Sequence, residues 1–119
     1  ISGAGGPIDL RPCEVGHGSM DSRGFRIGDL AYLPDVAEMT EEAWSAVAGL
    51  DCWVLDALRR TPHPTHVHLE RALEWIARAA PKRAVLTNMH IDMDYQTVAA
   101  ETPDHIAPAY DGMTISYDL

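Results

Sequence analysis

The chain has 119 residues, a net charge of −9 and 46% hydrophobic residues. This length fits one domain or part of a larger one, and the hydrophobic content is that of a globular protein rather than a disordered one. The acidic balance argues against nucleic-acid binding, which relies on a basic surface. No apolar run approaches the roughly 20 residues needed to cross a bilayer, so we expect no contact with membranes.

The start of the chain and its cysteines bear on its cellular context. Residues 1–7 read as a loop entered in mid-chain, and they lack the basic start and apolar stretch of a signal peptide. Cys13 and Cys52 are far apart, and each lies in an apolar run. We therefore expect buried, reduced thiols in a cytoplasmic protein.

Extended segments come first along the chain. Two of them flank Gly28-Asp29, a dipeptide typical of a hairpin turn. A polar side chain follows two of these segments. His17 follows the first one, and Asp35 follows Pro34 after the third. The three predicted strands cover residues 8–15, 24–27 and 30–33.

Helices and buried strands alternate in the rest of the chain. Thr40 is the expected N-cap of a first helix and Gly49 its expected stop. Apolar residues at helical spacing predict a second helix, which Pro81 ends. Helices are predicted at residues 40–49, 67–80 and 95–101, and strands at 52–55, 84–87 and, as a final edge strand, 113–117. This alternation predicts an α/β layer structure with a partly parallel sheet.

Three predicted strand ends present a group that can bind a metal: His17, Asp35 and His90. A neutral imidazole suits Zn²⁺, Mn²⁺ or Fe²⁺, and a carboxylate can bridge two cations. Taken singly, each of these side chains is more often an ordinary loop or turn residue. Their shared placement after strands favours a metal site, although spacing alone does not prove one.

The loop around His63, His66 and His68 forms a second cluster, held extended by Pro62 and Pro64. Three readings stay open. The histidines could bind zinc, one of them could act as a general acid or stabilise negative charge on a substrate oxygen, or they could be incidental to a polar loop.

Carboxylates near these clusters are candidates for orienting a metal-binding imidazole through its second nitrogen. Asp56 follows a buried strand, whereas Asp92 and Asp94 lie after His90. A solvated turn is the simpler reading for at least one of Asp92 and Asp94. We interpret His105, in a loop next to Pro103, as a surface residue.

The order of these segments, HG…GFRIGDLAYLPD…HPTHVHLERALEWI…KRAVLTNMHIDMDY…YDGM, resembles the C-terminal half of a metallo-β-lactamase-fold hydrolase. More narrowly, it resembles the branch with the cyclic-phosphate phosphodiesterase of phosphonate breakdown and the tRNA-processing nucleases. The resemblance runs from about Gly3 to Leu119. It implies that residues 1–119 form a partial domain, one half of an αβ/βα sandwich with a mixed sheet and flanking helices.

The resemblance also implies roles for individual residues. His17 would bind one metal, and Asp35 would bridge two divalent ions, zinc or manganese. His66 would contact the substrate phosphate or act as the general acid, with His68 beside it at the substrate. Each of these residues stands in a segment that matches the family's motif order.

The last metal ligand is where this sequence departs from the family. Many relatives have a histidine at the position of Asn88, and an amide oxygen is a weak ligand for zinc. We therefore expect His90 to reach in from the turn as the ligand. Asn88, Asp56 and Asp94 would then support the ligands.

A second departure is that the family's H-x-H-x-D-H signature is absent from the 119 residues. The resemblance thus implies a fragment that associates with a missing N-terminal half or with another copy of the chain. The intact protein would hydrolyse a small cyclic or nucleotide-like phosphate ester with a metal-activated water. Two alternatives remain: the chain alone is catalytically silent, or the intact protein processes RNA ends.

Overall fold

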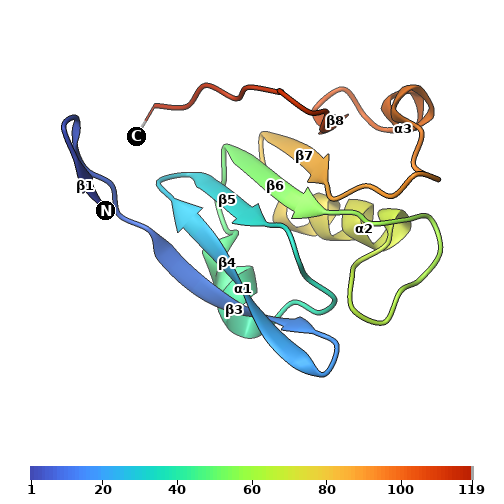
Figure 1. Cartoon of the computed structure of the whole chain (residues 1–119), viewed down its shortest axis with the longest axis horizontal. Helices are drawn as coiled ribbons and strands as arrows, with labels where there is room; N and C mark the ends of the chain where they lie inside the picture. The colour runs from blue at the N-terminus through green and yellow to red at the C-terminus, as the bar shows by residue number, and fades with distance from the viewer. Residues whose placement is uncertain (119) are drawn as a thin grey trace.

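The chain forms a mixed six-stranded sheet flanked by helices in the computed structural model, which describes residues 1–118 (Figure 1). The strands lie side by side in chain order, namely β3 (Arg11–His17), β4 (Met20–Ile27), β5 (Leu30–Leu33), β6 (Cys52–Asp56), β7 (Arg83–Thr87) and β8 (Ile106–Pro108). The helices are α1 (Glu41–Ala46), α2 (Leu69–Ala79) and α3 (Tyr95–Glu101). A separate hairpin pairs β1 (Ser2–Gly3) with β2 (Gly6–Pro7). The predicted α/β class with a mixed sheet and flanking helices is confirmed.

The direction of the strands brings several strand ends together. The pairs β3–β4 and β4–β5 are antiparallel, whereas β5 to β8 are all parallel. Two reversals separate β3 from β5, so β3 runs in the same direction as the parallel strands. The carboxyl ends of β3, β5, β6 and β7 therefore lie at one edge of the sheet, which we call the carboxyl edge.

Helices α1 and α2 lie behind the sheet in Figure 1 and cover one of its faces. Trp53 and Leu55 of β6 are fully buried on that face, together with Leu33 of β5 and Ile76 of α2. Each such side chain contributes about 1.5–3 kcal/mol through the burial of apolar surface. This core fixes the positions of β5 and β6, whose ends carry polar residues.

The opposite face of the sheet is less covered. Phe25 of β4 and Tyr32 of β5 are directly paired in the sheet, and their exposed fractions are 37% and 44%. Large apolar side chains side by side on a sheet face are typical of a surface that packs against something else.

The ends of the predicted helices differ by a few residues from the observed ends. The Thr40 hydroxyl accepts a hydrogen bond from the backbone N–H of Ala43 at 3.0 Å, which confirms the expected N-cap. Helix α1 ends at Ala46, before the predicted stop at Gly49. Helix α2 closes with Ala80 in the left-handed conformation, directly before Pro81.

The prediction of a final strand at residues 113–117 is wrong. The last strand in the described part of the chain is β8, which lies parallel to β7. Alternation of apolar and polar residues needs a pairing partner to become a strand, and β8 already occupies the free side of β7. The C-terminal segment is held instead by a hydrogen bond from the Arg83 guanidinium to the Ser116 carbonyl at 3.3 Å.

No helix among residues 1–118 is long and apolar enough to cross a membrane. Cys13 and Cys52 are both buried, as expected for structural thiols. Burial raises the pKa of each thiol, which keeps it in the unreactive protonated form.

Candidate metal centre

Three side chains predicted to be functional meet at the carboxyl edge of the sheet. His17, Asp35 and His66 each offer one ligand atom, and these atoms all lie within 4.8 Å of one another. The rings of His17 and His66 have centroids 4.7 Å apart in an edge-to-face arrangement. Residues from the end of β3, from the loop after β5 and from the loop after β6 thus form one polar cluster.

Backbone contacts explain why His17 and Asp35 lie close together. The loop after β5 hydrogen-bonds to Gly16, with N–H groups of Ala37 and Glu38 donating to its carbonyl at 2.7 and 3.2 Å. The Gly16 N–H in turn donates to the Glu38 carbonyl at 2.9 Å. These bonds join the residue before His17 to the loop that begins with Asp35.

Asp56 connects the other parts of the site. Its carboxylate is 0% exposed. One oxygen accepts hydrogen bonds from the Val36 N–H at 3.2 Å and from Nδ1 of His66 at 2.8 Å. The other oxygen accepts one from the Asn88 amide at 3.2 Å. Asp56 thus orients His66 and also holds the loops that carry Asp35 and Asn88. That Asp56 supports a metal-binding imidazole stays a prediction.

Burial raises the pKa of Asp56, and hydrogen bonds from His66, Val36 and Asn88 act in the opposite direction. With Nδ1 of His66 donating to this carboxylate, Nε2 of the same ring keeps its lone pair. His66 is 17% exposed. It therefore presents a nitrogen that can accept a proton or bind a cation.

His17 provides a direct test of whether a cation fits here. Its Nδ1 atom is buried and has no hydrogen-bond partner among residues 1–118. A buried polar atom without a partner costs free energy, which a bound cation or substrate would recover. Two imidazoles and one carboxylate are also a donor set that zinc and manganese accept. The residues present therefore fit a divalent metal.

The histidine-rich loop packs tightly against the turn after β3. A Cβ atom on Gly18 would lie 2.6 Å from the Thr65 side chain, so only glycine allows this approach. Thr65 donates its N–H to Nδ1 of His63 at 3.1 Å. Desolvation, Arg59 and the neighbouring histidines lower the pKa of His63, which favours its neutral form.

His68, predicted to lie at the substrate, is outside the three-residue cluster. It is the N-cap residue of α2, and its side chain makes no capping hydrogen bond. The loop from His63 to His68 therefore delivers one histidine, His66, to the cluster and places His63 beside it, with ring centroids 5.3 Å apart.

Some of the residues after β7 lie at the site, and others lie at the surface. Asn88 contacts both Asp56 and His66, the latter at 3.4 Å. The His90 side chain is 58% exposed and pairs with Asp92 at 3.2 Å, outside the three-residue cluster. Asp94 caps α3 by accepting hydrogen bonds from Thr97. The structure therefore brings Asn88, rather than His90, to the Asp56–His66 pair.

Comparison with known proteins agrees with this architecture. The chain belongs to the family described as the beta-lactamase superfamily domain, which matches residues 3–91. The predicted resemblance to that superfamily is confirmed. The family match includes His17, Asp35 and His66, which form the cluster.

Solved structures show the same fold over nearly the whole chain. A diphosphatase from the PhnP family is 30% identical, with a TM-score of 0.91, over 94% of this chain and 44% of that chain. The short form of human tRNase Z (ELAC1) is 17% identical, with a TM-score of 0.71, over 94% of this chain and 44% of its own. Zn²⁺-bound PqqB from Methylobacterium extorquens is 16% identical, with a TM-score of 0.67, over 92% of this chain and 50% of its own.

A curated relative also matches. It is a protein named octanoyltransferase from Porphyromonas gingivalis, 26% identical over 113 residues, which are 93% of this chain and 23% of that protein. The chain thus spans half or less of the length of the proteins it matches. That the matched part is the C-terminal half of the fold stays a prediction.

Proposed function

We propose that this chain is part of a metal-dependent hydrolase that acts as a phosphodiesterase on small phosphate esters. The observation that carries the proposal is the convergence of His17, Asp35 and His66 within 4.8 Å at the carboxyl edge. The buried Asp56 behind His66 supports it, because a structural histidine does not need a desolvated carboxylate to orient its ring.

In this proposal His17 and Asp35 would hold the divalent metal ions, zinc or manganese. When bound, the metal would lower the pKa of a water, polarise the phosphoryl oxygen and neutralise developing charge. Asp56 holds His66 through Nδ1, which leaves Nε2 available to the substrate. His66 would stabilise the phosphate or protonate the leaving oxygen.

The remaining ligand is assigned by the same proposal. His90 would have to turn inward from its exposed position beside Asp92 to bind metal. Asn88 would support the site through its hydrogen bond to Asp56, and Asp94 would hold the following loop through its cap on α3. His68 would contact the substrate from the start of α2.

The net charge of −9 favours a small substrate over a nucleic acid. Processing of RNA ends therefore remains the less favoured activity, since a nuclease would need a basic surface from residues outside this chain. We also propose that the face carrying Phe25 and Tyr32 packs against the other half of the sandwich, or against another copy of the chain. Both rings are partly exposed, which is consistent with such a contact.

The test of this function is hydrolysis of bis(4-nitrophenyl) phosphate, with Mn²⁺ or Zn²⁺, by a protein that joins this chain to the other half of the fold. We expect His66→Ala to lower kcat by about 100-fold, as loss of a general acid does. The matched control is His105→Ala, because His105 is exposed in a loop. A His66→Ala protein that hydrolyses the diester at the normal rate would contradict the proposed role.

A further inference from the structure

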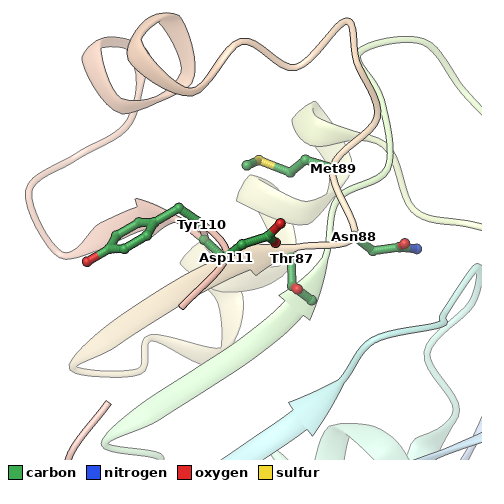
Figure 2. A pocket seen from close by; sticks show the side chains of 6 residues that line it. Thr87, Asn88, Met89, Tyr110 and Asp111 are labelled. Carbon is green, nitrogen blue, oxygen red and sulfur yellow. The ribbon is translucent and has the colours of Figure 1, made fainter. Parts of the chain in front are cut away.

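A recess lies on the carboxyl edge, next to the metal centre. It has a volume of about 320 Å³ and opens between the end of β7 and the segment after β8 (Figure 2). Its walls combine an aromatic ring, a carboxylate, a hydroxyl and two small or flexible apolar side chains. The lining residues are Thr87, Asn88, Met89, Ala109, Tyr110 and Asp111.

The recess exists because two parallel strands separate at this point. The last bond between them runs from the Ala109 N–H to the Leu86 carbonyl at 2.8 Å. The Thr87 carbonyl points to the other side of β7, as alternate carbonyls of a strand do, and accepts from the N–H of Ala57 at 3.0 Å. The recess thus lies at the carboxyl ends of two neighbouring parallel strands.

Asn88 is shared by this recess and the metal centre. It lines the recess, while its amide contacts Asp56 at 3.2 Å and lies 3.4 Å from His66. Figure 2 shows the Asn88 amide pointing away from Tyr110 and Asp111. Its left-handed backbone, with φ of 60°, produces this arrangement. A molecule held at His66 would therefore reach the recess by passing one side chain.

The lining residues favour a neutral ligand with hydrogen-bond donors over an anionic one. None of its six residues is Lys, Arg or His, and Asp111 is exposed, so an anionic group would be repelled. Tyr110 is 57% exposed and contacts the ring of Tyr95 edge to face at 5.9 Å. The ring offers a surface for stacking, and the Asp111 carboxylate and Thr87 hydroxyl can accept hydrogen bonds.

We infer that this recess binds the nucleoside part of a nucleotide-like phosphate ester, stacked on Tyr110 and donating hydrogen bonds to Asp111. The inference rests on the proposed function, because the metal centre would hold the phosphate. The volume is near the lower end of the range for ligand pockets, about 300 Å³. It therefore suits one nucleoside rather than a nucleic-acid strand.

The experiment measures adenosine binding to the 119-residue chain by equilibrium dialysis without metal. We expect Tyr110→Ala and Asp111→Asn each to weaken binding by about tenfold, a loss typical of a removed stacking partner. Tyr117→Ala is the matched control, since Tyr117 lies beside Asp51 and Arg83, at the opposite end of β7 from the recess. Its affinity for adenosine should equal that of the unchanged chain.

Two results would overturn the inference. One is an unchanged chain that does not bind adenosine, and the other is a Tyr110→Ala chain that binds it as tightly as the control. Because Asp111→Asn alters an exposed side chain and keeps its size, it tests the inference even if Tyr110→Ala does not fold. Adenosine carries no phosphate, so binding in a protein that fails to hydrolyse diesters would reject the proposed function alone.

Discussion

The charged pairs at the two edges of the central sheet differ in their exposure to solvent. At the amino edge, Lys82 pairs with Asp51 at 2.9 Å, and the side chains are 81% and 43% exposed. At the carboxyl edge, Asp56 pairs with His66 at 2.8 Å, and the side chains are 0% and 17% exposed. The two distances are nearly equal, so the difference between the pairs lies in their burial.

This difference in burial changes how each pair affects stability. A solvated ion pair such as Lys82–Asp51 costs little to form and contributes little to stability. A buried carboxylate has lost its hydration, and its partners recover only part of that cost. The fold carries such a group at the edge where His17, Asp35 and His66 meet, which is consistent with the proposed support of His66 by Asp56.

The largest expected effect comes from removing the buried carboxylate. Asp56→Ala leaves the Val36 N–H, the His66 ring and the Asn88 amide without their acceptor. We expect the free energy of unfolding to fall by about 3 kcal/mol, a typical loss when one partner of a buried pair is removed. Urea denaturation measures this change.

The matched control is Asp51→Ala at the amino edge, which removes an exposed carboxylate from an ion pair of similar length. Its free energy of unfolding should stay within about 0.5 kcal/mol of the unchanged chain, as for most surface substitutions. Equal losses of unfolding free energy in Asp56→Ala and Asp51→Ala would contradict the difference proposed between the buried and the exposed pair.

A smaller effect should come from the glycine that lets the histidine loop approach. Gly18 has a φ of +67°, and an added Cβ would lie 2.6 Å from the Thr65 side chain. Gly18→Ala should therefore destabilise the chain by about 2 kcal/mol, from backbone strain and a steric clash. It should also weaken metal binding, because Gly18 follows the proposed ligand His17 and must shift away from Thr65.

Gly49→Ala separates the cost of backbone strain from the cost of the steric clash. Gly49 has a nearly identical φ of +65°, but nothing lies within 4 Å of its added Cβ. This variant should lose only about 1 kcal/mol, the cost of the left-handed backbone. If Gly18→Ala and Gly49→Ala unfold at the same urea concentration, the close approach to Thr65 has no role.

The sequence predicted the parts of this site that depend on local pattern. Apolar runs located β6 and β7, and the parallel sheet then placed Asp35, Asp56 and Asn88 at one edge. The family resemblance added roles for His17 and His66, which the structure brings together.

Contacts between distant residues were not predictable in the same way. The three partners of Asp56 are 20, 10 and 32 residues away, and the sequence pattern does not show which loops meet. The predicted edge strand at 113–117, which is wrong, depended on packing that the pattern does not record. The sequence assigned no role to Tyr110 and Asp111 beyond their place in the YDGM segment, because their recess forms only where the pairing of β7 and β8 ends.

The measurement that tests the central claim most directly is a calorimetric titration of the 119-residue chain with Zn²⁺. If the cluster of His17, Asp35 and His66 holds a cation through His17 and Asp35, the chain binds Zn²⁺. His17→Ala then weakens this binding by at least about tenfold, a typical cost of altering a metal site, and His105→Ala leaves it unchanged. Equal affinity in the His17→Ala and His105→Ala chains, or no binding in the unchanged chain, would contradict the account.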